Sequence, residues 1–231
     1  WTAIPWSALI LFYLLRVFLV SAGIHRYFCH KVFLLNRFFQ FIFALGATLC
    51  LQNSVFWWAA KHRDHHKFIN DKKLDPHSHQ KGWFWSHIGW ILCDDDYIDE
   101  NSIKDLIKFK ELVFLHKHYK IINILFATLV WYLFGFLFFT SVYCLGTVLA
   151  WHTMFLVNSL CHKVGYRTFK TKDNSTNILA LSLITLGESL HNNHHSNPCR
   201  PNNRVNWFEI DLTYVILYVL SLIKIIKFKR K

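Results

Sequence analysis

The 231-residue sequence is poor in acidic residues and contains no common signature for binding nucleotides or nucleic acids. It has 14 Asp and Glu against 26 Lys and Arg, which gives a formal net charge of +12 at pH 7. No GxGxxG fingerprint, helix-turn-helix signal, C2H2 spacing or RNP-like pattern occurs in the chain. The basic residues flank apolar segments instead, as positive charge does at the cytoplasmic face of a membrane. We therefore assign the excess charge to a membrane surface and exclude a nucleic-acid partner.

Paired cysteine motifs are also missing. The six cysteines are scattered and form no CxxC, so neither a zinc ribbon nor a disulfide framework is indicated, and we expect reduced thiols. The first residues lack the basic region and the small-residue cleavage site of a signal peptide.

Long hydrophobic segments are abundant. Hydrophobic residues make up 53% of the chain, with 22 Phe and 10 Trp, which indicates an integral membrane protein. Residues 7–24 form an apolar run broken only by Arg16. Ile121 to His162 contains no Lys, Arg, Asp or Glu, and this stretch would be about 63 Å long as a helix, twice the hydrocarbon thickness. We expect spans at about 7–24, 121–138 and 142–160, with the hairpin turn near Phe139–Tyr143. For the intramembrane Arg16, a structural partner and snorkelling to the interface both remain open.

Histidines gather in three short boxes, HRYFCH, HRDHH and HNNHH. Neutral imidazole is the commonest protein ligand for transition metals, and the HxxHH offsets place three rings on one helical face. One ion takes four to six ligands, so two ions sharing the boxes fit better than one. The eight box residues are His25, His30, His62, His65, His66, His191, His194 and His195.

A shared metal centre requires all boxes on one side of the membrane. A crossing at 38–58 would separate the first box from the second, so we expect an interfacial helix there, and a surface helix at 210–228. The fold class is then an all-α integral membrane protein, a single domain over 1–231 with a helical cytoplasmic cap at 61–118 and 162–231. Three spans leave Trp1 on the far side, so we expect a fourth membrane helix before it in the full-length protein.

The ordered motifs identify a family resemblance. The chain resembles the membrane-bound fatty acyl desaturases, in particular the stearoyl-CoA (delta-9) desaturase-like branch. The matching segments, in order, are GIHRYFCHKVF, QNSVFWWAAKHRDHHKFINDKKLDPHS, KGWFWSHIGWIL, VNSLCHKVGYRTF, GESLHNNHHSNP and WFEIDLTYVI. Ser189 stands where the family usually has glycine, and the family's first membrane span has no counterpart in this sequence.

The resemblance implies a diiron site and its ligands. The eight box histidines would bind two irons, with His162 as a ninth ligand and Asn158 reaching a metal through water. No further catalytic residue or cofactor-binding residue is implied. For the other histidines, which are His77, His79, His87, His116, His118 and His152, we expect hydrogen-bonded or solvated roles instead of ligation.

Several neighbouring residues fit supporting roles. Acidic side chains near the boxes, namely Asp64, Asp71, Asp75 and Glu188, are candidates to orient the ligating imidazoles, although Asp64 and Asp71 fit solvated surface charge equally well. Tryptophans at 57, 58, 83, 85, 90 and 151 are candidates for the wall of an acyl channel, or for an aromatic core. The basic residues Lys61, Lys67, Lys72, Lys73 and Arg167 suit either a phosphorylated head group such as coenzyme A or positive-inside charge.

The implied activity is O2-dependent desaturation that places a cis double bond, at the delta-9 position, into a long-chain saturated acyl thioester such as acyl-CoA, or an acyl lipid. No side chain can abstract hydrogen from an unactivated methylene, so the oxidant must come from O2 at iron. The chain has no HPGG signature of a cytochrome b5-like domain, so electrons would come from a separate donor such as ferredoxin or cytochrome b5. A membrane fatty acid hydroxylase is the nearest alternative, and a metal-binding transporter or sensor is a more distant one.

Overall fold

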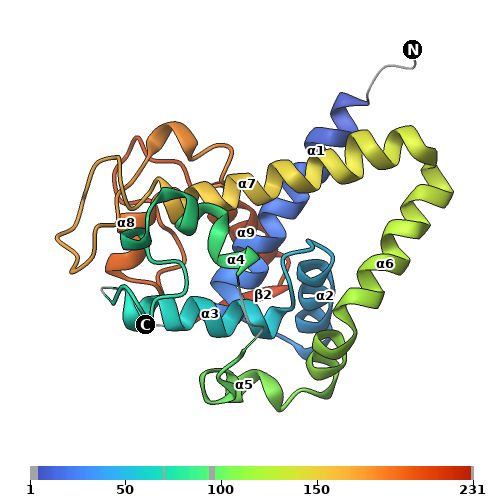
Figure 1. Cartoon of the computed structure of the whole chain (residues 1–231), viewed down its shortest axis with the longest axis horizontal. Coiled ribbons are helices and arrows are strands. Elements are labelled where there is room, and N and C mark those ends of the chain that lie inside the picture. The colour runs from blue at the N-terminus through green and yellow to red at the C-terminus, as the bar shows by residue number, and fades with distance from the viewer. Residues whose placement is uncertain (1–4, 70, 94–96, 230–231) are drawn as a thin grey trace.

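The computed structural model describes residues 5–69, 71–93 and 97–229 and is mostly helical (Figure 1). The α-helices are α1 Trp6–Phe18, α2 Arg37–Thr48, α3 Val55–Phe68, α4 Trp90–Leu92, α5 Lys104–Ile107, α6 Lys110–Phe138, α7 Leu145–Ser159, α8 His191–Ser196 and α9 Leu212–Leu222. Three segments are π-helical, namely η1 Leu19–Cys29, η3 Trp85–Gly89 and η5 Phe139–Cys144. Short 3-10 turns are η2 His79–Lys81, η4 Glu100–Ile103 and η6 Leu179–Leu181.

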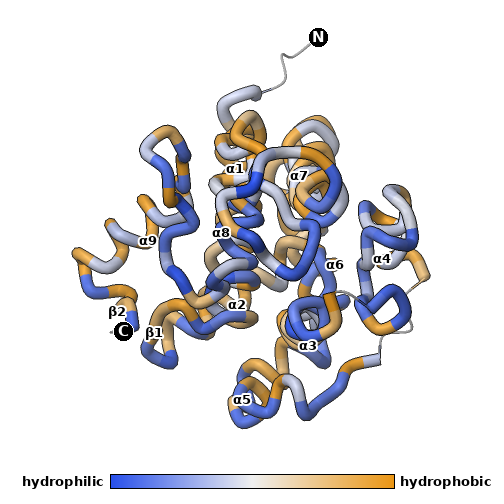
Figure 2. Tube along the Cα trace, turned by 90° about the vertical axis from the view of Figure 1, so that its left-hand side faces the viewer, coloured by the Kyte–Doolittle hydropathy of each residue, from blue (hydrophilic) through white to orange (hydrophobic). Residues whose placement is uncertain are grey.

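Two continuous helices within the described residues are long and apolar enough to cross a membrane. The first, Trp6–Cys29, joins α1 to η1, and the second, Lys110–Ser159, joins α6, η5 and α7. Only 11% of the apolar window of the second helix is buried inside the protein, unlike the core helix of a soluble domain. In Figure 2, hydrophobic residues run along much of α1 and α7, while the segments around α8 are hydrophilic. The molecule therefore has an apolar helical part and a polar part that contains the third histidine box, and the two parts lie in different regions.

The second of these helices reverses direction at Gly135, so the expected turn at Phe139–Tyr143 is wrong. Gly135 has φ 77° and ψ 173°, a conformation that favours glycine, and Figure 1 shows α6 and α7 diverging from this end of the molecule. Thr140 and Ser141 do not break the helix, because each hydroxyl donates to a carbonyl one turn earlier, Thr140 to Phe136 at 3.0 Å and Ser141 to Leu137 at 2.6 Å.

The single helix expected over 38–58 is divided into α2 and the start of α3. Leu51 and Asn53 adopt positive φ values of 59° and 64°, which no helix can continue through. Ser54 then starts α3 as its N-cap, its hydroxyl accepting from the amide of Trp57 at 3.2 Å.

The helix expected over 210–228 is also shorter than predicted. After α9 ends at Leu222, the strand β2 (Ile226–Phe228) pairs antiparallel with β1 (Phe33–Leu35), which follows the first histidine box. This two-stranded ribbon is the exception to the all-α expectation within the described residues. It joins residues 226–228 to the segment that follows the first histidine box.

Arg16 has structural partners inside the first apolar helix. Its guanidinium donates to the carbonyl of Leu49 at 2.6 Å and lies over the rings of Phe12 and Tyr143, at 4.5 and 5.1 Å from their centroids. These contacts join α1 to the α2–α3 connection and to η5. Of the two roles left open for this residue, the structure supports the structural partner.

Candidate metal centre

Five histidines from all three boxes converge on one point. The candidate ligand atoms of this first cluster all lie within 4.8 Å of one another, and the residues are His25, His30, His62, His66 and His194. The Nε2 atoms are in direct contact: His30 with His62 at 2.8 Å, His66 with His62 at 3.0 Å, and His194 with both His25 and His66 at 3.1 Å.

These contacts match the geometry of ligands around one metal ion. With metal–nitrogen bonds of about 2.1 Å, two ligands at a right angle lie about 3.0 Å apart. Five nitrogens without a shared cation would bring lone pairs or N–H groups into close opposition in a buried place. The donor set therefore fits a transition metal such as iron.

Four more histidines form a second cluster beside the first. They are His65, His162, His191 and His195, again with ligand atoms within 4.8 Å of one another. The Nε2 atoms of His162 and His191 are 3.0 Å apart, and the buried Nε2 atoms of His65 and His195 have no hydrogen-bond partner among the described residues. Buried polar atoms almost always have partners, so these two nitrogens also fit a role as metal ligands.

Each HxxHH box contributes to both clusters. In the second box, His62 and His66 join the first cluster and His65 joins the second. In the third box the division is reversed, with His191 and His195 in the second cluster and His194 in the first. The first and last histidines of each box, four residues apart, lie on the same side of a helix. The other histidine, three residues after the first, is rotated toward the neighbouring cluster.

The first box reaches its cluster through π-helical backbone. Segment η1 contains His25 and ends at the C-cap His30, whose amide donates to the carbonyl of His25 at 3.2 Å. This five-residue spacing is the π-helical repeat, so it brings the two side chains to the same side of the segment. Their ring centroids are 4.8 Å apart, with the rings edge to face at 83°.

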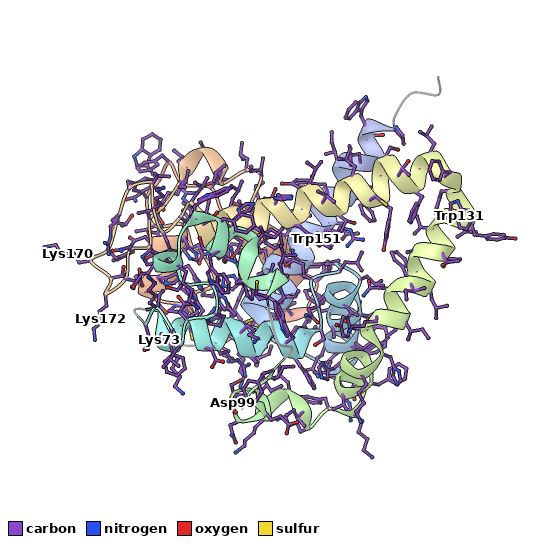
Figure 3. The ribbon with its side chains drawn as sticks, in the orientation of Figure 1. Lys73, Asp99, Trp131, Trp151, Lys170 and Lys172 are labelled. Carbon is purple, nitrogen blue, oxygen red and sulfur yellow. The ribbon has the colours of Figure 1, made fainter. Side chains whose placement is uncertain are left out.

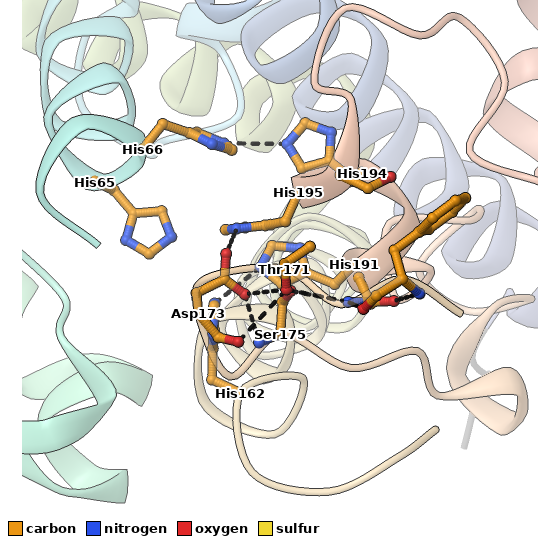
Figure 4. A network of polar contacts seen from close by, with 12 residues as sticks. His65, His66, His162, Thr171, Asp173, Ser175, His191, His194 and His195 are labelled. Carbon is orange, nitrogen blue, oxygen red and sulfur yellow. Dashed lines mark hydrogen bonds and ion pairs between the residues drawn. The ribbon is translucent and has the colours of Figure 1, made fainter. Parts of the chain in front are cut away.

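Three carboxylates orient the histidine rings through their Nδ1 atoms. Glu188 pairs with His25, and Asp75 accepts from His65 at 2.9 Å. Asp173 accepts from His195 at 3.1 Å (Figure 4). A hydrogen bond at Nδ1 fixes the tautomer and leaves the Nε2 lone pair free for a metal.

Glu188 is the most heavily engaged of these carboxylates. It is buried, and it also accepts from Arg26 at 2.8 Å and Ser21 at 2.5 Å. Burial by itself would raise the pKa of Glu188, but His25, Arg26 and Ser21 together lower it to about 2. The carboxylate is therefore ionised throughout the physiological range. Arg26 also pairs with Asp211 at 2.9 Å. This contact joins the first histidine box to the segment that follows the third box.

Of the acidic residues singled out from the sequence, Asp75 and Glu188 contact histidines, whereas Asp64 and Asp71 make no such contact within the part of the chain that the structure describes. Asp71 instead accepts from the backbone amides of Lys73 and Leu74. Sequence reasoning missed Asp173, because this residue lies 22 positions before His195 on a separate loop.

Eight of the nine cluster histidines have lowered pKa values, which favour the neutral form that metal binding requires. Burial, reinforced by neighbouring imidazoles, lowers the pKa of His66 to about 3 and that of His162 to about 4. The same causes move the pKa of His30, His62, His65, His191, His194 and His195 well below the ordinary value.

The remaining candidates lie close to this centre or apart from it. Asn158 is buried in the last turn of α7, four residues before His162. His77 is buried beside His65, with ring centroids 4.0 Å apart, and with His65 and Asp75 it forms a third group that could hold a metal. Among the other histidines, His79, His87, His116 and His152 are hydrogen-bonded, as expected, and His118 lies against Phe114.

Polar residues inside the boxes hold the scaffold, a role that the sequence reasoning did not assign. The amide nitrogen of Asn193 donates to Glu209 at 3.0 Å, and Asn192 accepts from the backbone amides of Thr168 and Phe169 at 2.8 Å each. The two asparagines in the middle of the HNNHH box are therefore buried anchors for α8. Gly187 precedes this helix with φ 101°, and a Cβ there would lie 2.7 Å from an Asp211 oxygen.

Arg63 performs a similar function between the first two boxes. Its guanidinium donates to the carbonyls of Phe28 and Cys29 at 2.6 and 3.1 Å and pairs with Asp105 at 2.7 Å. This arrangement fixes the end of η1 against α3.

An apolar cavity of 270 Å³ lies beside the first cluster. Its lining consists of Leu51, Gln52, Asn53, Trp57, Trp58, Trp90, Ile91, Tyr119, Trp151 and Phe155. Four of the six candidate tryptophans therefore line this cavity. The other two do not, since Trp83 stacks on His87 and Trp85 donates to the carbonyl of Pro76. The ring of Trp58 is 5.7 Å from that of His62, so the cavity adjoins the histidines. Narrow apolar walls beside a metal centre suit a hydrocarbon chain.

Comparison with known proteins gives consistent matches. Residues 3–218 match the family model described as fatty acid desaturase. The chain is 36% identical to the sn-2 palmitoyl-lipid 9-desaturase of Nostoc sp. (strain 36), over 96% of this chain and 81% of that protein. It is 34% identical to an acyl-CoA 5-desaturase of Anemone leveillei, over 96% of this chain and 70% of that protein. It is 32% identical to the sn-1 stearoyl-lipid 9-desaturase of Anabaena variabilis, over 96% and 82%.

Proposed function

Because the chain belongs to the fatty acid desaturase family, we propose that it places a cis double bond, at the delta-9 position, in a long-chain saturated fatty acyl group. The observation that carries the proposal is the convergence of nine histidines into two adjoining clusters beside an apolar cavity. The relatives are named for acyl-lipid and for acyl-CoA substrates, and the long-chain acyl group is common to both.

We propose the following assignment of ligands. The first cluster holds one iron, and the second holds another with Asn158 contributing through water. Bound there, two irons would supply, with O2 and two external electrons, the oxidising power to remove hydrogens from an unactivated methylene pair.

The protein's own residues would bind and orient the reactants. Glu188, Asp75 and Asp173 hold His25, His65 and His195 with Nε2 pointing inward. The tryptophan-lined cavity takes the acyl chain, excludes water from it and places it beside the first cluster. The depth at which the chain is held then selects the carbon pair that reacts.

The proposed topology has three crossings in this chain, one by Trp6–Cys29 and two by the arms of Lys110–Ser159 on either side of Gly135. The histidine clusters would face the cytoplasm. The distribution of basic residues supports this orientation, because the apolar stretch from Ile121 to His162 contains none.

The test is expression of the full-length protein in a desaturase-deficient host, followed by analysis of acyl chains by gas chromatography and mass spectrometry. The His62→Ala/His194→Ala variant serves as the inactive protein, and His118→Ala, outside both clusters, is the matched control. New delta-9 monounsaturated chains with the wild type and with His118→Ala, but not with the cluster variant, are expected. Hydroxylated chains would indicate a hydroxylase, and no new product from an iron-loaded protein would refute the enzymatic role. Supplying the acyl group as acyl-CoA or within membrane lipid identifies the carrier.

A further inference from the structure

A polar cleft of 510 Å³ has histidines of both clusters in its lining and shares no lining residue with the tryptophan-lined cavity, here called the acyl cavity. We name it the lysine cleft, after Lys170 and Lys172 at its rim; its lining also includes His66, His195, Phe169 and Asp173. Neither the acyl cavity nor the basic cleft beside Arg200 has a cluster histidine in its lining.

The lining of the lysine cleft includes one histidine from each cluster. His66 belongs to the first cluster and His195 to the second, and their rings stack with centroids 4.6 Å apart and an interplanar angle of 29°. The Nε2 of His66 is also 3.1 Å from that of His194, as Figure 4 shows. A redox group held over this cleft would therefore be separated from the candidate metal positions by single imidazole rings.

The rim of the cleft is basic and held in a fixed shape. Lys170 and Lys172 are exposed, whereas the acidic residue of the lining, Asp173, is buried against His195. The loop that carries both lysines is anchored by Arg167, which donates to the carbonyls of Thr171 and Asp173 at 3.0 and 2.8 Å. Such a preformed basic rim suits an acidic macromolecule.

We propose that the lysine cleft is the docking and electron-entry site for an acidic one-electron carrier protein. This inference rests on the proposed desaturase function. Converting –CH2–CH2– to –CH=CH– releases two hydrogens, that is, two electrons and two protons, while reducing O2 to two waters takes four of each. The other two protons come from water, and the two remaining electrons come from two reduced carriers, each oxidised by one electron.

The location of the cleft favours a protein over a membrane surface. Figure 3 places Lys73, Lys170 and Lys172 at the end of the molecule opposite Trp131, which lies on the apolar arm α6. A lipid head group at the surface crossed by α6 is therefore distant from the lysine rim.

The test uses the full-length, iron-loaded protein in nanodiscs and two acidic probes, a plant-type [2Fe–2S] ferredoxin and the soluble domain of cytochrome b5. The variant is Lys170→Glu/Lys172→Glu. The matched control, Arg200→Glu/Lys229→Glu, changes the net charge equally in the other basic cleft. Dissociation constants are measured at low and high ionic strength, together with the rate at which each reduced probe is oxidised.

We expect the lysine-cleft variant to bind at least one probe about tenfold more weakly or worse than wild type, with a smaller salt dependence, and the control to change less than about twofold. Oxidation of that probe slows in parallel, while dithionite still drives a single turnover in the variant, which shows an intact centre. An unchanged dissociation constant for both probes would overturn the proposal. So would a variant that loses only acyl-CoA affinity or only binding to anionic vesicles. If the wild type forms no product with dithionite but probe binding still depends on the two lysines, the desaturase function fails and the docking site stands.

Discussion

Asp173 offers the most specific test of how the second cluster is built. This carboxylate accepts from three donors: its Oδ1 from the Thr171 hydroxyl at 3.0 Å and the Ser175 amide at 2.7 Å, and its Oδ2 from His195 at 3.1 Å. In Asp173→Asn one of the two terminal atoms becomes an NH2 group, so a donor must face a donor in either orientation of the amide. The unmade bond costs about 1–3 kcal/mol at a buried site.

The effect on the metal follows from the loss of the acceptor at His195. Removing a carboxylate that orients a ligating histidine typically weakens metal binding about 10- to 100-fold, or about 1.4–2.7 kcal/mol. Anaerobic Fe2+ titration by equilibrium dialysis should show two irons bound to wild type, and one tight and one weakened site in the variant. Asp71→Asn is the matched control, because among the described residues the Asp71 side chain accepts hydrogen bonds from backbone amides, which an amide oxygen also satisfies, and from no histidine. Two unchanged iron affinities in Asp173→Asn would refute the assignment of Asp173 to the site.

Three further predictions follow from contacts elsewhere in the centre. Arg26→Met removes the guanidinium that pairs with two buried carboxylates, Glu188 and Asp211, and should lower the free energy of unfolding by about 3–5 kcal/mol, measured as a lower Tm in detergent; an unchanged Tm would contradict the pairing. Trp151→Ala enlarges the acyl cavity and should shift the products toward longer chains, whereas Trp151→Phe should keep the wild-type chain-length profile. The metal-free protein should lose stability as the pH falls below about 6.5, by about 1.4 kcal/mol per pH unit for each of His66 and His162. In the folded protein these histidines have pKa values of about 3 and about 4, so the unfolded chain binds protons at a higher pH than the folded chain does. Denaturation midpoints that do not change between pH 7.5 and pH 5 would contradict this.

The parts of the site that local spacing determines could be predicted from the sequence. HxxHH places its rings on one helical face whatever the rest of the chain does, and the structure brings all eight box histidines and His162 together. Asp75 and Glu188 were also within reach of sequence reasoning, because each lies near a box along the chain. Asp173 was not, since its loop meets His195 only through tertiary packing.

The errors in the fold have local backbone causes. The polar residues Thr140 and Ser141 predict the hairpin turn at the wrong position. A hydroxyl in an apolar helix can bond to the helix's own backbone, as that of Thr140 does, and so carries little information about chain reversal. Gly135, with its positive φ, was the better indicator. Likewise, hydropathy alone predicts a continuous helix over 38–58, because it does not register the left-handed backbone at Leu51 and Asn53.

The division of each HxxHH box between two clusters explains why the two metal positions can keep a constant separation. His65 and His66 are adjacent in α3 and serve different clusters, and His194 and His195 do the same in α8. The relative positions of these pairs are set by the rise and rotation of a helix, which vary little, and not by loops. A small displacement of either helix would move a histidine of each cluster in the same direction. The two clusters are therefore coupled mechanically through α3 and α8, which suits the proposed reaction at two metals beside one acyl chain.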